Sequence, residues 1–212
     1  MPPKPKFTRE QVISAALEIT AEKGIENLSS RELGAALGSS ARPIFTLFRN
    51  MEELNAEVRT GAIRLFEETA YKADDSLPPF KRVGMSMIRF AAEKPKLFRL
   101  LYMTENGEKT DFDDMFLYLG SIAQVCVETI ERDYELDEPK AKELFRHLWI
   151  FTYGVGALIA TGACCFTESE ASHMLSREFL AYIKLLGGKM KVKAPADLTE
   201  EEIKSFTAEE EK

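Results

Sequence analysis

The chain has 212 residues, 45% of them hydrophobic and 30% charged, and its formal net charge is −7. This composition is ordinary for a soluble globular protein, and the acidic balance argues against a coat that binds nucleic acid without specificity. The charge is uneven, because residues 1–60 hold eight Lys and Arg against eight Asp and Glu, and the remainder holds 20 against 27. The first segment is therefore the part of the chain that phosphate repels least.

Apolar residues recur at every third or fourth position, and alternating runs are scarce, so the sequence predicts an all-α protein. Thr8 can cap a first helix, and Gly24 suits a left-handed stop after it. Ser29 and Glu32 have the spacing of a capping box. They predict a short second helix that Gly38 ends.

A third helix is expected after Ser40, with Pro43 in its first turn, where amide groups have no helical acceptor in any case. Ile44, Phe45 and Phe48 are expected to face inward. Two short helices joined by a glycine-containing turn, and braced by a preceding helix, form a helix-turn-helix. The second helix of such a motif can enter the major groove of DNA.

Arg42 lies near the beginning of that second helix, where contacts to base edges originate. A guanidinium group matches the two acceptors of guanine. An isolated arginine is more often a solvated surface charge, but the surrounding pattern of three helices favours a base-reading role for Arg42.

Residues 8–58 resemble the DNA-binding domain of the TetR-type family of transcriptional repressors. The resemblance follows the stretch ALEITAEKGIENLSSRELGAALGSSARPIFTLFRNMEEL, in which the matching positions are Gly24, Ser29, Leu33, Gly38, Ser40, Ile44, Phe48 and Leu54. The sequence departs from the family at three positions. Phe45 stands where the family usually has Tyr, Thr46 where it often has His, and Met51 where it commonly has Lys. These departures weaken the phosphate contacts that the resemblance implies.

The basic residues Arg49, Lys4 and Lys6 are candidates for the phosphate contacts, and the last two lie on a proline-rich arm that can reach the backbone or the minor groove. The full set predicted to bind DNA is Lys4, Lys6, Ser29, Ser39, Ser40, Ala41, Arg42, Pro43, Phe45, Thr46 and Arg49.

Beyond residue 50 the pattern predicts a long helix to about residue 73 and further helices near 80–93, 96–104, 112–134, 140–163 and 169–186. This layout resembles the nine-helix plan of the family. We expect a helix-turn-helix domain at 1–50, an effector-binding and dimerisation domain at 51–188, and a charged tail at 189–212. Thr199 can cap a stretch of this tail, and both a docked and a loose helix are compatible with it.

The resemblance implies that the second domain binds a small apolar or aromatic effector, which releases DNA by favouring a different spacing of two DNA-binding heads. The residues expected to surround it are Met87, Phe90, Phe98, Tyr102, Phe116 and Phe151. Such residues pack cores more often than they line cavities, so ordinary core packing is the alternative for each.

A single head reads only a few base pairs, so a homodimer on a palindromic operator is expected. Gly156 and Ala160 lie one turn apart and allow two helices to approach closely. The helices near 140–163 and 169–186 are therefore predicted to form a four-helix bundle with their symmetry mates. The expected interface residues are Phe145, Trp149, Tyr153, Gly156, Ala160, Phe179, Tyr182 and Ile183.

Three cysteines, Cys126, Cys164 and Cys165, are too few for a disulfide framework, and no charged-then-apolar export signal opens the chain, so a cytoplasmic protein is expected. Cys164 and Cys165 are adjacent and lack the C-x-x-C spacing of a zinc or redox motif. We expect packed thiols at both positions, with a thiol sensor as the alternative.

The sequence predicts a homodimeric, effector-responsive DNA-binding regulator, and repression is its expected action. Nineteen uncharged residues at 148–166 leave a membrane-tethered regulator as one alternative, although a buried helix explains the same run. A helical ligand-binding module that has lost DNA binding is the other. Catalytic and phosphate-binding motifs are absent from the sequence, so we expect no enzyme, metal or cofactor.

Overall fold

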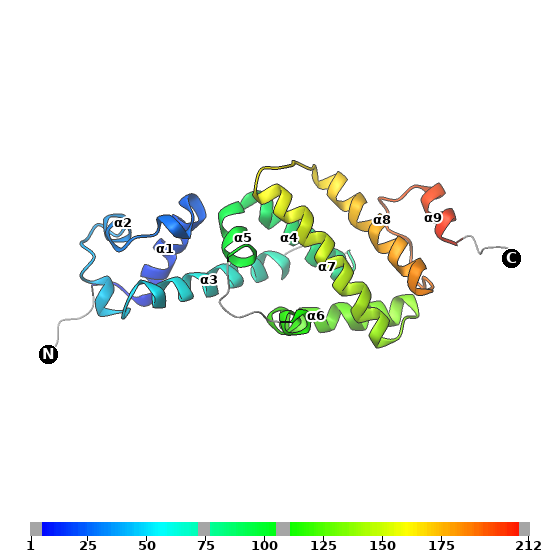
Figure 1. The fold of residues 1–212 in the computed structure, drawn as a ribbon, viewed down its shortest axis with the longest axis horizontal. Helices are drawn as coiled ribbons and strands as arrows, with labels where there is room; N and C mark the ends of the chain where they lie inside the picture. The colour runs from blue at the N-terminus through cyan, green and yellow to red at the C-terminus, as the bar shows by residue number, and fades with distance from the viewer. Residues whose placement is uncertain (1–5, 72–76, 105–110, 208–212) are drawn as a thin grey trace. The chain divides into compact units, whose positions relative to one another are not determined.

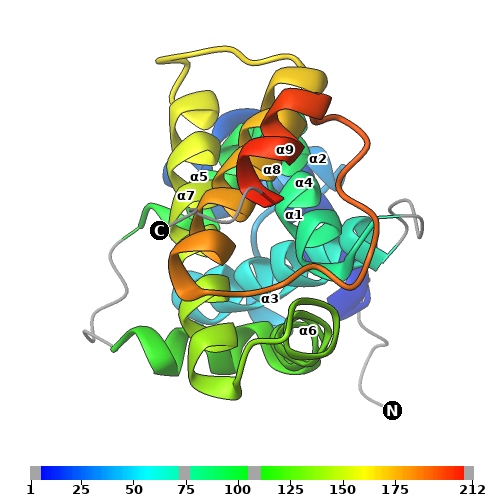
Figure 2. The same cartoon turned by 90° about the vertical axis from the view of Figure 1, so that its right-hand side faces the viewer.

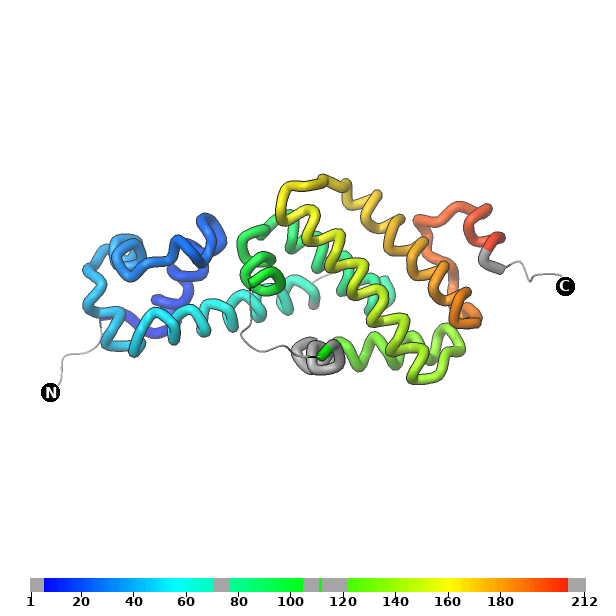
Figure 3. Tube along the Cα trace, in the orientation of Figure 1, coloured from blue at the N-terminus to red at the C-terminus, as the bar shows by residue number. Residues whose placement is uncertain are grey.

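The computed structural model describes residues 6–71, 77–104 and 111–207, and every regular element within them is helical (Figure 1). The all-α fold expected from the sequence is confirmed. Figure 3 follows the chain through these helices. They are α1 Arg9–Lys23, α2 Ser30–Ala36, α3 Met51–Tyr71, α4 Pro79–Glu93, α5 Pro95–Tyr102, α6 Phe112–Tyr134, α7 Glu138–Ala160, α8 Glu168–Leu186 and α9 Glu200–Thr207. Two short 3₁₀ turns are added at Ile25–Asn27 and Ile44–Thr46.

Packing divides the described chain into two compact units. Unit 1 holds residues 6–71 and 90–104, and unit 2 holds residues 77–89 and 111–207. The functional domains expected at 1–50, 51–188 and 189–212 are not tested by this division, and they stay a prediction.

Unit 1 begins at the capping box that opens α1. The Thr8 hydroxyl accepts from the Gln11 amide at 3.2 Å, and the Thr8 amide donates to the Gln11 side chain at 2.9 Å. The helix ends at Gly24, whose φ of 90° is positive as expected, but whose ψ of 155° lies outside the left-handed helical region. Helix α1 then packs against α3 and α5 within the same unit.

One arginine on α1 joins three segments of unit 1. Arg9 donates to the backbone oxygen of Leu47 at 2.5 Å, and its guanidinium lies 4.2 Å from the centre of the Phe48 ring. It also donates to Glu53 at 3.1 Å and to Glu57 at 2.9 Å, both on α3. Arg9 therefore ties α1 to α3 and to the chain just before α3.

Unit 2 is built on the consecutive packing of α6, α7 and α8. Part of its core is a cluster that joins α4 to α7 and α8, and its buried members are Met85, Ile88, Val155, Ala171 and Leu175. Gly84 permits this close contact, because a Cβ there would lie 3.3 Å from Leu175 and 3.4 Å from Thr152.

The C-terminal tail is docked on unit 2, which decides between the two states that the sequence allowed. Thr199 caps α9 through reciprocal hydrogen bonds with Glu202, and Glu202 also lies 3.2 Å from Arg177 on α8. The Lys184 ammonium on α8 donates to the backbone oxygen of Ser205 at 2.7 Å. Figure 2 shows the chain leaving α8 and returning to α9 beside it.

The uncharged run at 148–166 is not one helix. Helix α7 ends at Ala160, and Gly162 follows in a loop with a positive φ of 72°. Among the described residues, no helix combines the length and apolar character needed to cross a membrane.

Candidate nucleic-acid interface and ligand cavity

The chain between α2 and α3 forms one short turn instead of the full helix expected after Ser40. Its regular part is the 3₁₀ turn Ile44–Thr46, with hydrogen bonds from the Ile44 amide to Ala41 at 3.1 Å and from the Leu47 amide to Ile44 at 3.0 Å. Pro43 occupies the capping position, and no side chain caps this turn. Proline removes an amide donor, and a segment this short cannot stabilise an α-helix alone. We call residues 39–49 the recognition segment.

Gly34 on α2 lets the recognition segment approach that helix closely. The Ser39 amide donates to the Gly34 oxygen at 2.8 Å. A Cβ on Gly34 would lie 2.9 Å from the carbonyl carbon of Ser40 and 3.0 Å from the Ala41 nitrogen, which is too close for backbone atoms. This role was not predicted, because its only signal in the sequence is a glycine inside a short helix, where alanine is favoured.

The recognition segment is anchored by Ile44 and Phe48, which are buried as expected. Phe45 is 45% exposed, so the expectation that it faces inward is wrong. Consecutive residues of a 3₁₀ turn are about 120° apart, and Phe45 therefore leaves the face on which Ile44 is anchored.

Most of the described residues predicted to contact DNA lie on the recognition segment, whereas Ser29 lies at the beginning of α2 and Lys6 precedes α1. Lys4 lies outside the described residues. Ser40, Arg42 and Thr46 are exposed, and Ser39, Ala41 and Pro43 are partly buried. Arg42 forms no ion pair with any residue that the structure describes, so its guanidinium is available to a ligand.

Other polar members of the predicted set are partly engaged by the protein itself. The Lys6 ammonium donates to the Ser39 hydroxyl at 3.0 Å, which brings the N-terminal arm to the recognition segment. The Thr46 hydroxyl donates to Pro43 at 2.6 Å. Ser29 caps α2 by accepting from the Glu32 amide at 3.2 Å. The Glu32 carboxylate pairs with Lys23, so only half of the expected capping box is made.

Arg49 is almost fully exposed but is held by α3. Its amide donates to Glu53 at 2.7 Å, and its Nε lies 3.3 Å from the same carboxylate. The hydrogen bond from the Arg49 backbone, followed by that from Arg9, keeps the pKa of Glu53 below its usual value. Glu53 is therefore ionised at neutral pH and offsets part of the positive charge of Arg49.

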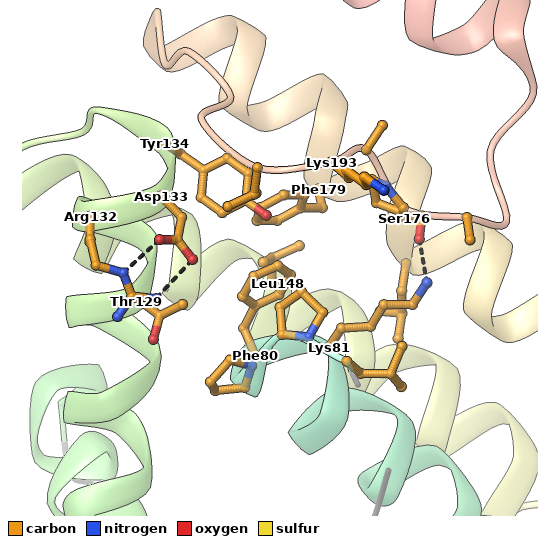
Figure 4. Close-up of a pocket in the computed structure, with 18 of the residues that line it drawn as sticks. Phe80, Lys81, Thr129, Arg132, Asp133, Tyr134, Leu148, Ser176, Phe179 and Lys193 are labelled. Atoms are coloured by element: carbon orange, nitrogen blue, oxygen red, sulfur yellow. Dashed lines mark hydrogen bonds and ion pairs between the residues drawn. The ribbon is translucent and has the colours of Figure 1, made fainter. Parts of the chain in front are cut away.

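Unit 2 contains a cavity of about 700 Å³ (Figure 4). This volume lies within the range of small-molecule sites. Phe80 and Phe179 stack with their ring centres 4.2 Å apart, and Tyr134 meets Phe179 edge-on at 4.8 Å. The lining residues come from the beginning of α4 and the chain before it, the end of α6, the middle of α7 and α8, and the tail: Leu77, Pro78, Pro79, Phe80, Lys81, Thr129, Arg132, Asp133, Tyr134, Leu148, Thr152, Leu175, Ser176, Phe179 and residues 192–196.

Among the residues expected to bind an effector, the five whose side chains the structure describes do not line this cavity. Met87, Phe90 and Phe98 are buried. Tyr102 packs on Phe98 with ring centres 4.9 Å apart, and Phe151 packs against the core cluster of unit 2. The side chain of Phe116 lies outside the described residues, and the effector role of this set stays a prediction. The sequence pattern does not reveal the cavity, because its lining residues come from separate helices and an irregular tail that no single period connects.

The residues expected at a dimer interface are mostly buried within the protomer. Those buried are Phe145, Trp149, Gly156, Ala160, Phe179 and Ile183. Tyr153 and Tyr182 are partly exposed. Tyr182 lies beside His147, with ring centres 3.8 Å apart, and donates to Glu143 at 3.0 Å. The dimer itself stays a prediction, but buried side chains have little surface to offer a partner.

The expectation that Cys164 and Cys165 are packed is wrong, because both are exposed. They follow the end of α7 at Ala160 and lie in the loop before α8, so no helix face carries them into the core. Cys126 lies on α6 and is buried, which raises the pKa of its thiol to about 12. This thiol is therefore protonated at neutral pH.

Comparison with known proteins connects this geometry to a family. Residues 12–58 match the model of the bacterial regulatory proteins of the tetR family. No curated protein shows significant sequence similarity to the chain.

Solved structures share the fold. A TetR-like transcriptional regulator from Rhodococcus sp. RHA1 is 19% identical, with a TM-score of 0.57 and coverage of 87% of this chain and 100% of that chain. A second transcriptional regulator from the same organism is 15% identical, with a TM-score of 0.55 and coverage of 88% and 100%. NalD of Pseudomonas aeruginosa, the secondary repressor of the MexAB-OprM multidrug efflux pump, is 16% identical, with a TM-score of 0.50 and coverage of 82% and 94%. At these identities, the likeness concerns the fold.

The close approach at Gly34 yields a prediction. Gly34→Ala is expected to destabilise unit 1 by about 1 to 3 kcal/mol, because the added methyl group overpacks against backbone. The same change should weaken binding to DNA selected by the wild-type protein. Denaturant unfolding followed by circular dichroism and a mobility-shift assay measure the two effects.

Gly61→Ala on α3 is the matched control, because the nearest atoms to its Cβ lie at 3.7 Å. It should stabilise unit 1 by about 0.5 to 1 kcal/mol, since alanine is favoured over glycine in a helix. Equal unfolding midpoints for the two variants would contradict the proposed role of Gly34.

Proposed function

The chain belongs to the tetR family of bacterial regulatory proteins, and we propose that it is a homodimeric repressor that binds a palindromic operator and is released by a small ligand. The proposal rests mainly on the position and exposure of the recognition segment. It lies within the stretch that matches the family, it is held against α2 at Gly34, and it presents Arg42 to solvent. The proposed place of action is the cytoplasm.

Arg42 is proposed to read a base, and the remaining basic groups to contact the DNA backbone. Arg42 is exposed and unpaired among the described residues, so binding a base edge breaks no ion pair. Arg49 is partly neutralised by Glu53, which suits a less specific phosphate contact. Lys6 is already positioned beside Ser39 and extends the same surface.

The repressor role is supported by one structural neighbour, NalD of Pseudomonas aeruginosa, which is itself a repressor. Ligand response is supported by the cavity in unit 2, which offers aromatic walls and hydroxyl groups in a volume suited to a small molecule. The expected set that includes Met87, Phe90 and Phe98 remains a second proposal for effector binding, and these three side chains are buried.

The proposed dimer pairs α7 and α8 with the same helices of a second copy. Their solvent side carries an unusual amount of apolar surface, because Ile150 is 54% exposed, Leu158 is 41% exposed and Leu185 is 74% exposed. Gly154 lies between the first two at helical spacing, and a Cβ there would touch nothing within 4 Å. A flat strip between two apolar side chains allows a partner helix to approach closely.

The role of Arg42 is tested by DNA selection with the wild type and with Arg42→Ala. The variant should lose about 1 to 3 kcal/mol of binding free energy and relax the base preference at one position in each half-site. Arg49→Ala should weaken binding to all sequences alike, because phosphate contacts carry no base information. If Arg42→Ala selects the wild-type motif unchanged, Arg42 does not read a base.

The dimer is tested with the double variant Ile150→Glu and Leu158→Glu, measured by light scattering and by operator binding. Four buried carboxylates in a symmetric interface should convert the protein to a monomer and abolish operator binding. Val125→Glu on α6 is the control, because Val125 is 46% exposed on another helix of the same unit. The interface lies elsewhere if the double variant remains a dimer, or if the control dissociates equally.

A further inference from the structure

The cavity in unit 2 is closed on one side by an irregular segment of the tail. We call residues 189–198, between α8 and α9, the strap. At its start the Lys189 amide donates to the Tyr134 oxygen at 2.9 Å, and the Lys191 amide donates to the Asp133 oxygen at 2.9 Å. Its middle part, residues 192–196, forms one wall of the cavity. The strap is therefore attached to the end of α6 before it passes over the cavity.

The far end of the strap is held by a buried ion pair. Lys81 on α4 is 6% exposed, and its ammonium donates to both oxygens of Asp197, at 2.9 and 2.8 Å. It also donates to the Ser176 hydroxyl at 2.6 Å (Figure 4). Asp197 accepts further hydrogen bonds from Ser172 at 2.7 Å and from Ser176 at 2.9 Å. We call Lys81 and Asp197 the latch.

The latch makes the position of the strap depend on charge. Burial alone would raise the pKa of Asp197, but hydrogen bonds from Lys81, Ser172 and Ser176 outweigh it and lower the pKa. Asp197 is therefore ionised at neutral pH and compensates the ammonium of Lys81. A strap that lifts from the cavity withdraws this carboxylate from a buried cation, which opposes opening.

We propose that the cavity is a binding site for uncharged aromatic compounds, and that the strap is a gate which must unlatch at Lys81 and Asp197 for ligand to enter or leave. This inference rests on the ligand response in the proposed function and adds the ligand class and the route of entry.

The class of ligand follows from the walls. Phe80, Phe179 and Tyr134 provide aromatic surface, and the hydroxyl groups of Thr129 and Thr152 provide hydrogen-bonding partners. The charged groups at the cavity are largely compensated, because Lys81 pairs with Asp197, and Arg132 pairs with Asp133 at 2.6 Å. Lys193 is exposed, so water screens its ammonium. A charged ligand would lose hydration in this site and gain little in return.

The experiment uses the full chain without DNA and two fluorescent probes that differ by one charged group. N-phenyl-1-naphthylamine is uncharged, and 1-anilinonaphthalene-8-sulfonate is its anionic counterpart. The uncharged probe is expected to bind at least about tenfold more tightly, because the sulfonate must be desolvated. Equal or tighter binding of the sulfonate, or no binding of the uncharged probe, would overturn the ligand class.

The gate is tested by the rates of binding, followed by stopped-flow fluorescence with N-phenyl-1-naphthylamine. Asp197→Asn should accelerate both association and dissociation by about tenfold, because a weaker latch opens more often in either direction. Ser172→Ala removes one hydrogen bond to Asp197 and should accelerate both rates by a smaller factor. It also keeps the test decisive if Asp197→Asn does not fold.

Glu135→Gln is the matched control. It breaks the exposed ion pair between Glu135 and Lys191, at 3.2 Å, on the same strap but away from the latch. Its rates should equal those of the wild type. If only dissociation accelerates in the Asp197 and Ser172 variants, the strap is a wall and not a gate. Unchanged rates in both variants would also reject the gate.

The site is located with Ala194→Trp, which places an indole in the cavity from the strap and should abolish binding of the uncharged probe. Undiminished binding would place the probe elsewhere and overturn the site. Release of operator DNA is measured separately. Gated binding without DNA release would reject the ligand response in the proposed function but not the gate, whereas DNA release with ungated binding would do the reverse.

Discussion

The recognition segment of unit 1 is too short to maintain its own conformation. A single 3₁₀ turn at Ile44–Thr46 has few internal hydrogen bonds, so its position must be fixed by neighbours. Gly34 allows backbone contact with α2, and Phe48 is buried beneath the guanidinium of Arg9. The position of Arg9 is itself fixed, because its guanidinium donates to Leu47 and to two glutamates of α3. The shape of the surface proposed to bind DNA is therefore set by Gly34, Phe48 and Arg9, which are not among the residues predicted to contact DNA.

Unit 2 uses the same physical device on a different segment. The strap, like the recognition segment, is an irregular stretch of chain between two helices. Arg9 on α1 helps to fix the recognition segment through Glu53 on α3, which also accepts from the Arg49 amide. Lys81 on α4 fixes the strap through Asp197, which belongs to the strap itself. The two cations differ in exposure. Arg9 is partly exposed, so water screens its ion pairs, whereas Lys81 is buried and depends strongly on Asp197. Loss of the carboxylate partner is therefore expected to cost more at Lys81 than at Arg9.

The sequence predicted most of the helices because their signals are local, but the helix expected after Ser40 is only a 3₁₀ turn. The caps at Thr8 and Thr199 and the stop at Gly24 are formed as the sequence indicated, apart from the ψ of the glycine. It failed where side-chain direction depends on packing. The spacing of Phe45 predicted a core residue, but the 3₁₀ turn rotates its side chain outward. Cys164 was predicted to be a small buried thiol, but it follows the end of α7 and is exposed. The sequence period does not reveal the cavity, because its walls are assembled from α4, α6, α7, α8 and the strap.

Amide hydrogen exchange is the sharpest test of the proposal that the recognition segment binds DNA. Exchange would be followed in the wild-type protein, free and bound to DNA that the protein itself selects. If the proposal is correct, DNA should slow amide exchange mainly in residues 39–49 and at the beginning of α2, because a bound duplex excludes water there. Slowed exchange confined to unit 2, with residues 39–49 exchanging as in the free protein, would contradict it.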